Sequence, residues 1–316
     1  MHTVVVLGAG AVGSLFGARL AAAGASVLLI GRPAHVAAIR TEGLTVEGVD
    51  PGTFRVDAAT ELPPGTASRA VLVTVKSFDL ASAAGELGHA LRPTPTALLG
   101  NGLGIEEAAS RAVRDAGWAH PEAVLVRGVH TIPATLLGPG RVRASGRGEV
   151  VFPSPTPSAA GSGAIEALVG LFRDAGVPVR TSSTFDRELW RKAVVNAAIN
   201  PVTAVRGVLN GALARGPARK EAEALLAEAV AVARAEGVDL TLETALADLE
   251  RVVQQTAENR SSMLQDVERG RPTELEAISG EILRRGGRLG LQLPATERAV
   301  AQVLGRLNGR ERPAQR

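Results

Sequence analysis

The segment from residue 3 to residue 30 constrains the fold of this chain more than any other part of the sequence. An apolar run at 3–8 leads into Gly8-Ala9-Gly10-Ala11-Val12-Gly13, a helical pattern covers 11–23, and a second apolar run follows at 26–30. In this strand–loop–helix–strand order, the first glycine permits a tight turn, the second lets a pyrophosphate approach the backbone, and the third packs helix against strand. The helix N-terminus offers free N–H groups to the phosphates. The pattern therefore predicts a βαβ unit that binds a dinucleotide.

The rest of the first half continues the alternation of strands and helices. Short apolar runs at 70–75 and 96–100 are separated by helix-like segments, which is typical of a parallel α/β sheet. Residues 122–152 change to a β-rich pattern with glycine turns, and we expect antiparallel strands there that complete the sheet. The composition of Pro153–Gly163 predicts a surface loop, before a helix at 164–175 and a short strand at 177–180.

The second half has a different pattern. From 185 to about 305 nearly every segment has helical periodicity, and Asn308–Arg316 is a polar end that we expect to be frayed. The predicted fold class is therefore α/β, with a Rossmann-type dinucleotide-binding domain at 1–181 followed by an all-helical domain at 182–316 that binds substrate.

Composition excludes several classes of protein. No segment reaches eighteen uninterrupted apolar residues, so we expect no membrane span, and the N-terminus carries neither the basic region nor the cleavage site of a signal peptide. The chain has no cysteine, which excludes disulfides and thiolate metal sites and is compatible with a cytoplasmic protein, and no His/Asp/Glu cluster has the spacing of a metal site. With a net charge of +3, dispersed arginines and 3% aromatic residues, nucleic-acid binding has weak support.

The end of the second apolar run indicates which dinucleotide is bound. An Asp or Glu there would bind the ribose 2′-hydroxyl of NAD, but the sequence reads Ile30-Gly31-Arg32-Pro33. A guanidinium at this place pairs with a 2′-phosphate. We therefore expect NADPH/NADP+ as the cofactor, with Arg32 as the 2′-phosphate ligand, although a solvated surface arginine is the ordinary alternative.

A polar stripe predicts the chemical site. Lys192, Asn196 and Asn200 recur every four residues in a helical segment whose other residues are mostly small or apolar. Each buried amide left unsatisfied costs roughly 1–3 kcal/mol, so such a stripe is expected to have a polar ligand. Reduction of a carbonyl by hydride needs an acid for the forming alkoxide, and Lys192 suits this role if burial lowers its pKa.

Further polar residues follow predicted strands or the later helices. Lys76 and Asn101 come after the runs at 70–75 and 96–100, where open α/β sheets bind ligands, although a solvated strand end and a glycine-flanked turn are equally good explanations. Asn259 and Ser262 are expected to share a helical face and to bind a carboxylate and a hydroxyl. Glu274 lies near a helix start, where a capping role is the simplest interpretation.

With these motifs in order, the chain resembles the ketopantoate reductases (2-dehydropantoate 2-reductases) over essentially its whole length. The most specific matches are Lys192-x-x-x-Asn196-x-x-x-Asn200-Pro201 and Ser261-Ser262-Met263-Leu264-Gln265-Asp266, followed eight residues later by Glu274. The resemblance implies NADPH-dependent reduction of 2-dehydropantoate to pantoate, a step toward pantothenate and coenzyme A. The stretch Val129–Pro133 and the loop Pro153–Gly163 are less typical of the family.

The resemblance also implies roles for individual residues. Lys192 resembles the general acid, and Glu274 resembles a residue that orients substrate or lysine. The implied substrate-binding residues are Asn196, Asn200, Asn210, Asn259 and Ser262. The implied cofactor-binding residues are Gly8, Ala9, Gly10, Ala11, Val12, Gly13, Arg32, Lys76 and Asn101. The expected partner is a small 2-oxo acid, without nucleic acid or membrane, and the expected assembly is a monomer or homodimer.

Two other functions remain open at this point. A related NAD(P)-dependent 2-oxo or 2-hydroxy acid dehydrogenase, or a β-hydroxyacid dehydrogenase, uses the same scaffold, although the small-residue substrate loop expected of the latter is not found. A non-catalytic NADP-binding sensor would be expected to lack Lys192 or Glu274, and both are present.

Overall fold

The computed structural model describes residues 4–156 and 160–310, and its contacts divide the chain into two compact units. The N-terminal unit consists of Met1–Gly100 and Gly104–Phe185, and the helical unit consists of Asn101–Leu103 and Asp186–Arg316.

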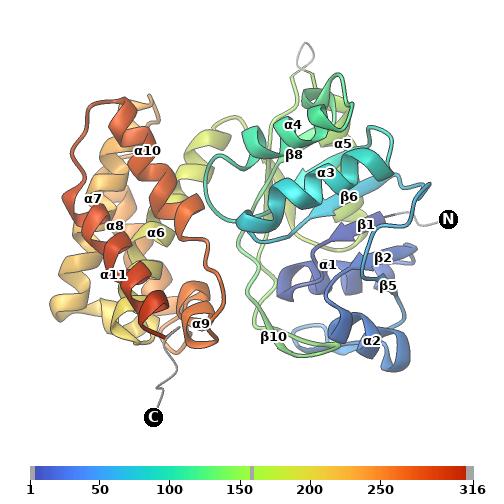
Figure 1. The fold of residues 1–316 in the computed structure, drawn as a ribbon, viewed down its shortest axis with the longest axis horizontal. Coiled ribbons are helices and arrows are strands. Elements are labelled where there is room, and N and C mark those ends of the chain that lie inside the picture. The colour runs from blue at the N-terminus through green and yellow to red at the C-terminus, as the bar shows by residue number, and fades with distance from the viewer. Residues whose placement is uncertain (1–3, 157–159, 311–316) are drawn as a thin grey trace. The chain divides into compact units, whose positions relative to one another are not determined.

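The N-terminal unit is built on a six-stranded parallel sheet with the order β5-β2-β1-β6-β7-β8 (Figure 1). Its strands are β1 (Val4–Leu7), β2 (Val27–Ile30), β5 (Asp57–Ala59), β6 (Ala70–Val73), β7 (Thr96–Leu98) and β8 (Leu125–Arg127). All four residues of β1, of β2 and of β6 are buried, as expected for strands that are covered on both faces. The predicted Rossmann-type architecture is confirmed.

Alternating residues of β1 face two separate hydrophobic cores. Val4 and Val6 pack in the core that contains α1 (Ala11–Ala22), α2 (Pro33–Glu42) and α5 (Ser162–Asp174). Val5 and Leu7 pack in the core that contains α3 (Leu80–Ala90) and α4 (Ile105–Asp115). Short 3₁₀ turns, η1 (Ser77–Asp79) and η2 (Pro121–Ala123), precede α3 and β8. Helices therefore cover both faces of the sheet.

Two smaller sheets replace the antiparallel extension that we expected at 122–152. Only β8 joins the main sheet, and it does so in parallel. One small sheet has the order β10-β11-β3-β4, with β3 (Leu44–Gly48), β4 (Gly52–Phe54), β10 (Ala134–Gly138) and β11 (Arg141–Ala144). The other has the order β13-β12-β9, with β9 (Val129–His130), β12 (Val150–Pro153) and β13 (Val179–Ser182).

The burial pattern of the strands explains why the expectation was wrong. The hairpin strand β11 alternates exposed and buried residues, and most of β3, its parallel partner, alternates buried and half-buried residues. Such strands suit a sheet with one face toward solvent, whereas strands of the main sheet are buried on both faces. The hairpin therefore pairs with β3 and packs against α1 instead of continuing the main sheet.

The helical unit is centred on α6 (Phe185–Arg206), as the sequence predicted for the region after 185. Around it lie η3 (Asn210–Ala214), α7 (Gly216–Ala235), α8 (Leu242–Gln255), α9 (Ser262–Glu268), the π-helical η4 (Glu276–Gly280), α10 (Glu281–Arg288) and α11 (Pro294–Arg310). Apolar residues of α6, α7, α8, α10 and α11 share one core. Figure 1 shows these helices next to one another. Helix α11 continues to Arg310, so residues 308–310 are helical rather than frayed, and 311–316 lie outside the described residues.

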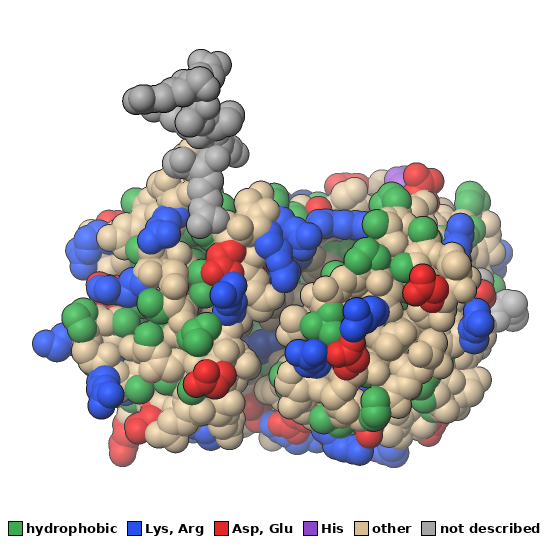
Figure 2. Space-filling view, turned by 90° about the horizontal axis from the view of Figure 1, so that it is seen from below, with side chains coloured by type: hydrophobic (Ala, Val, Ile, Leu, Met, Phe, Trp, Pro, Cys, Tyr) green, Lys and Arg blue, Asp and Glu red, His purple; other side chains and the backbone are tan. Residues whose placement is uncertain are grey.

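The predicted loop Pro153–Gly163 is shorter than we expected. Pro153 is the last residue of β12 and Ser162 the first of α5, because a β-strand and a helix extend into it from either side; 157–159 lie outside the described residues. None of the described helices is both long enough and apolar enough to cross a bilayer. On the face shown in Figure 2, basic and acidic side chains are interspersed.

Candidate active site

The glycine loop between β1 and α1 has the tight geometry that its sequence suggests. Gly8 has a φ of +102°, and a Cβ there would lie 2.6 Å from the backbone nitrogen of Val75. A Cβ on Gly13 would lie 2.2 Å from the carbonyl oxygen of Gly8. Around Gly10, by contrast, no described residue other than its chain neighbours lies within 4 Å of the place of a Cβ, so the backbone is open to a ligand there. The first and third glycines are therefore required by packing, and the second leaves space.

The end of β2 lies against this loop. The carbonyl of Ile30 accepts hydrogen bonds from the N–H groups of Gly8 at 3.0 Å and of Ala9 at 2.8 Å. A Cβ on Gly31 would lie 2.7 Å from the Cβ of Ala9. Arg32, the next residue, is exposed and is the N-cap residue of α2. Two helix N-termini and one guanidinium thus belong to the same edge of the sheet, which is the arrangement that a phosphorylated dinucleotide needs.

Lys76 leaves the sheet at the same edge. Because β6 runs parallel to β1 with Val73 opposite Leu7, the residues that follow both strands lie at the carboxyl ends. Lys76 is half-buried and precedes η1. Thr74, which our sequence analysis did not single out, donates a 2.8 Å hydrogen bond from its hydroxyl to the carbonyl oxygen of Gly8. No pattern in the sequence marks this threonine, since its partner is 66 residues away.

Lys192, Asn196 and Asn200 lie on α6 as predicted. Asn200 is 5% exposed, whereas Lys192 and Asn196 are half-buried. Within residues 4–156 and 160–310, the side-chain amides of Asn196 and Asn200 form no hydrogen bond with another residue. Buried or half-buried amides normally have partners, so these two are available to a polar ligand.

Glu274 and Asn101 meet in the helical unit. The carboxylate of Glu274 is buried and accepts a 3.1 Å hydrogen bond from Nδ2 of Asn101, across 173 residues of sequence. The next residues form the π-helical η4, a conformation that is frequent at functional sites. Its Ala277 carbonyl accepts a 2.9 Å hydrogen bond from the N–H of Leu103. Asn101, which we expected on the cofactor side, therefore contacts a residue that we expected to be catalytic.

The expected helical face shared by Asn259 and Ser262 is not found. Asn259 lies in the turn before α9, and Ser262 is the first residue of that helix; both are exposed. The reason is that the Ser261 hydroxyl accepts a 3.1 Å hydrogen bond from the N–H of Leu264, so the helix begins only after Ser261. Ser261 also hydrogen-bonds to the Thr203 hydroxyl at 2.7 Å, which joins α9 to α6.

Asn210 is held by the same turn. Its N–H donates to the carbonyl of Asn259 at 3.0 Å, and its Nδ2 donates to the Thr256 hydroxyl at 2.9 Å. Its buried Oδ1 has no partner among the described residues. The structure thus brings Asn210 and Asn259 together and leaves one amide oxygen available.

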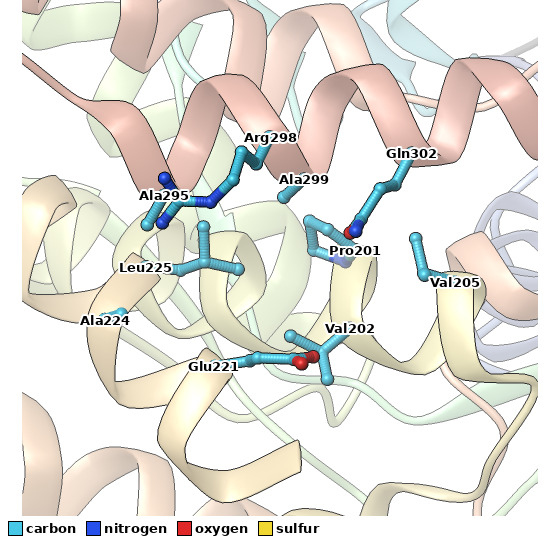
Figure 3. A pocket seen from close by; sticks show the side chains of 10 residues that line it. All are labelled: Pro201, Val202, Val205, Glu221, Ala224, Leu225, Ala295, Arg298, Ala299 and Gln302. Carbon is cyan, nitrogen blue, oxygen red and sulfur yellow. The ribbon is translucent and has the colours of Figure 1, made fainter. Parts of the chain in front are cut away.

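A separate pocket lies among α6, α7 and α11 (Figure 3). Its lining includes Pro201 and Val202 of α6, Leu225 of α7 and Arg298 of α11, and it contains none of the predicted site residues. Pro201 lies nine residues after Lys192, which at about 100° per residue places it half a turn around the helix axis from the lysine. This pocket is therefore on the other side of α6 from the polar stripe.

The predicted residues are divided between the two units. Gly8–Gly13, Arg32 and Lys76 belong to the N-terminal unit, and the substrate-side residues, with Asn101, belong to the helical unit.

Comparisons with known proteins identify the family. The model for ketopantoate reductase PanE/ApbA matches residues 4–156, and the model for its C-terminal part matches residues 184–306. A 2-dehydropantoate 2-reductase of Archaeoglobus fulgidus is 34% identical over 306 residues, covering 96% of this chain and 98% of the relative. A crystal structure of a PanE/ApbA family ketopantoate reductase from Ralstonia eutropha is 34% identical, with a TM-score of 0.86, and covers 98% of this chain and 100% of that one.

The same fold occurs in D-mandelate dehydrogenase, whose ternary structure with NADH and anilino(oxo)acetate has a TM-score of 0.89 at 24% identity, covering 98% of this chain and 100% of that one. At this identity the likeness concerns the fold alone. The two family models together match most of the chain, which therefore belongs to the ketopantoate reductase (PanE/ApbA) family of oxidoreductases.

Proposed function

We propose that this chain reduces 2-dehydropantoate to pantoate with NADPH, and that Lys192 is the general acid. The observation that carries the proposal is the stripe on α6, where an ammonium group is followed at four-residue intervals by two side-chain amides that form no hydrogen bond with another described residue. We further propose that residues 1–181 bind NADPH and that 182–316 bind substrate and hold the acid.

The residues of the glycine loop and of β2 suit the cofactor. The open backbone at Gly10 and the N-terminus of α1 would hold the pyrophosphate, and Arg32 would bind the 2′-phosphate. Lys76, at the carboxyl end of β6, would contact the nicotinamide side of the cofactor. When bound, NADPH supplies the hydride that is added to C2 of the substrate.

The helical unit supplies the proton and the substrate contacts. Lys192 donates a proton from Nζ to the C2 oxygen as that oxygen becomes an alkoxide, and its positive charge stabilises the developing negative charge. Asn196 and Asn200 offer amide groups to the substrate's carboxylate and hydroxyl, with Asn210, Asn259 and Ser262 in support. Glu274 orients the lysine or the substrate, and Asn101 holds the Glu274 carboxylate by their hydrogen bond.

The first experiment follows NADPH consumption by the purified protein with 2-dehydropantoate, pyruvate, 2-oxoisovalerate and a β-keto acid. We expect fast turnover of 2-dehydropantoate alone. Selective turnover of another 2-oxo acid would support the same mechanism but would make this chain a related dehydrogenase with a different substrate. Binding of NADPH without any turnover would contradict the proposal and favour the sensor.

Lys192→Ala tests the acid directly. We expect kcat to fall about 10²–10⁴-fold, the usual contribution of a general acid, while the Kd of NADPH stays unchanged. Lys220→Ala is the matched control, because Lys220 is an exposed lysine of α7 outside the proposed site. If kcat survives nearly unchanged in the Lys192 variant, another group donates the proton.

Location and assembly complete the proposal. We infer a cytoplasmic enzyme, with which a chain without cysteine is compatible, and a monomer or homodimer. Light scattering of the purified protein measures the mass, and a larger assembly would contradict the second part.

A further inference from the structure

His35 stands apart from the predicted site, yet its main chain is tied directly to Arg32. It is the third residue of α2 and is only 5% exposed. The N–H groups of His35 and Val36 both donate to the carbonyl of Arg32, at 3.0 Å each. Any movement of the first turn of α2 therefore moves the backbone of Arg32 with it.

The imidazole of His35 connects α2 to two other elements. The N–H of Gly140, in the turn between β10 and β11, lies 2.9 Å from Nδ1. Because a backbone N–H can only donate, Nδ1 accepts, and a neutral ring then carries its proton on Nε2. Nε2 lies 2.9 Å from the Ser14 hydroxyl, to which it donates. The ring thus uses one acceptor and one donor, as its neutral form provides.

The serine partner belongs to the helix that follows the glycine loop. Ser14 is fully buried in the first turn of α1, and its N–H donates to the carbonyl of Gly10 at 2.9 Å. The imidazole therefore joins the first turn of the helix expected at the pyrophosphate to the first turn of the helix that begins after Arg32.

The third attachment is held firmly by its own packing. Gly140 has a φ of +70°, and a Cβ there would lie 3.0 Å from the Cβ of Ala38 on α2. Its carbonyl accepts a 2.9 Å hydrogen bond from the N–H of Thr45 at the start of β11's partner strand. The turn is thus held by α2 on one side and by β3 on the other, and it fixes the position of the N–H that donates to His35.

We propose that His35 is a positioning residue for NADPH: held between Ser14 and Gly140, it sets where Arg32 stands relative to the glycine loop. The proposal rests on the proposed function, in which Arg32 binds the 2′-phosphate. Recognition of phosphate by a guanidinium depends on the direction of paired N–H groups, so a small rotation of α2 weakens it. NADH has no 2′-phosphate and is affected less.

The test measures equilibrium binding of NADPH and NADH to the full chain by quenching of its tryptophan fluorescence. In His35→Leu, which fills a similar volume without hydrogen bonds, we expect the Kd of NADPH to rise about tenfold and that of NADH about twofold or less. His35→Gln, whose amide has a donor and an acceptor, should retain most of the preference for NADPH. Ser14→Ala removes one partner only and should shift the Kd ratio in the same direction.

A purely structural role would lower thermal stability and leave the ratio of the two Kd values unchanged, and that result in a folded variant would overturn the proposal. If His35→Leu does not fold, an unchanged ratio of the NADPH and NADH Kd values in Ser14→Ala would overturn the proposal. In Arg32→Ala the His35 substitution should have no further effect on the ratio, because both act through one contact. Equal losses of NADPH and NADH in Arg32→Ala itself would instead refute the 2′-phosphate assignment.

Discussion

Two neighbouring glycines of the nucleotide loop are expected to respond in opposite ways to the same added methyl group. In Gly13→Ala the Cβ would lie 2.2 Å from the carbonyl oxygen of Gly8 and 2.4 Å from the Thr74 hydroxyl. These contacts must open by about 1 Å, and overpacking of this kind typically costs about 1–3 kcal/mol. The 2.8 Å hydrogen bond from Thr74 to Gly8 is also disturbed, which adds about 1 kcal/mol.

We therefore expect Gly13→Ala to lose about 2–4 kcal/mol of unfolding free energy in the N-terminal unit. For a unit of this size that loss lowers Tm by about 4–16 °C. Gly10→Ala is the matched control, because its Cβ would meet none of the described residues within 4 Å, apart from its chain neighbours, and its φ of −83° suits alanine. Its stability should be unchanged or higher by up to about 1 kcal/mol.

NADPH binding is expected to be impaired in Gly10→Ala, the variant whose stability is not reduced. In Gly10→Ala the methyl group occupies the space through which a pyrophosphate approaches the backbone, so we expect the Kd of NADPH to rise at least about tenfold in a fully folded protein. The measurements are thermal unfolding without ligand and NADPH titration at a temperature where both variants are folded. A Gly13→Ala protein as stable as the wild type would refute the packing argument, and unchanged binding by Gly10→Ala would refute the pyrophosphate assignment.

Three further predictions concern the stability of contacts inside each of the two units. Asp248 on α8 binds Arg191 of α6 through two hydrogen bonds of 2.6 and 2.7 Å and also contacts Arg251, so Asp248→Asn should cost about 1–3 kcal/mol in urea unfolding at neutral pH. Burial alone would raise the pKa of Asp248, but the hydrogen bonds from Arg191 and Arg251 outweigh it, so the pKa lies below 3.8. The difference in unfolding free energy between wild type and Asp248→Asn should therefore be complete above pH 3.8 and disappear as the pH falls below it. Glu228 of α7 accepts three hydrogen bonds at the start of α11, from two backbone N–H groups and one hydroxyl, and Glu228→Ala should cost about 1–3 kcal/mol by the same measurement; an unchanged midpoint would contradict this cap. Burial lowers the pKa of His35 below 6.5, so the folded state takes up its proton later than the unfolded state, and stability should be complete above pH 6.5 and decrease below it, a slope that His35→Gln should reduce.

Local patterns in the sequence predicted the nucleotide-binding half well, because its constraints act over a few residues. Tight packing at Gly8 and Gly13 leaves no space for a side chain, and the run of buried residues in β1 distinguishes a strand covered on both faces. The four-residue spacing of Lys192 and Asn196 likewise specifies one face of a helix without knowledge of its neighbours.

Pairings across long stretches of sequence were not predictable in the same way. The glycine turns at 122–152 indicated antiparallel strands, and β10 and β11 pair in that way, but nothing local reveals that β11 pairs with β3, almost one hundred residues earlier. The start of α9 depended on a choice between two adjacent serines. Ser261 became the cap because its hydroxyl accepts a hydrogen bond from the N–H of Leu264 and also hydrogen-bonds to the hydroxyl of Thr203, which lies 58 residues away.

Asn101 shows why the position of a residue on a sheet does not by itself give its partner. It follows β7, where the rule for open α/β sheets predicts a ligand, and the family resemblance implied a role on the cofactor side, which stays a prediction. Yet Asn101–Leu103 pack with the helical unit, because Gly102 has a φ of +94° and a Cβ on it would lie 2.4 Å from the Ala277 carbonyl oxygen. The π-helical turn at Ala277 directs that carbonyl to the Leu103 N–H and leaves the Glu274 carboxylate beside Asn101. A glycine and a π-helical turn that lie far apart in the sequence thus decide the environment of the carboxylate that we propose for the reaction.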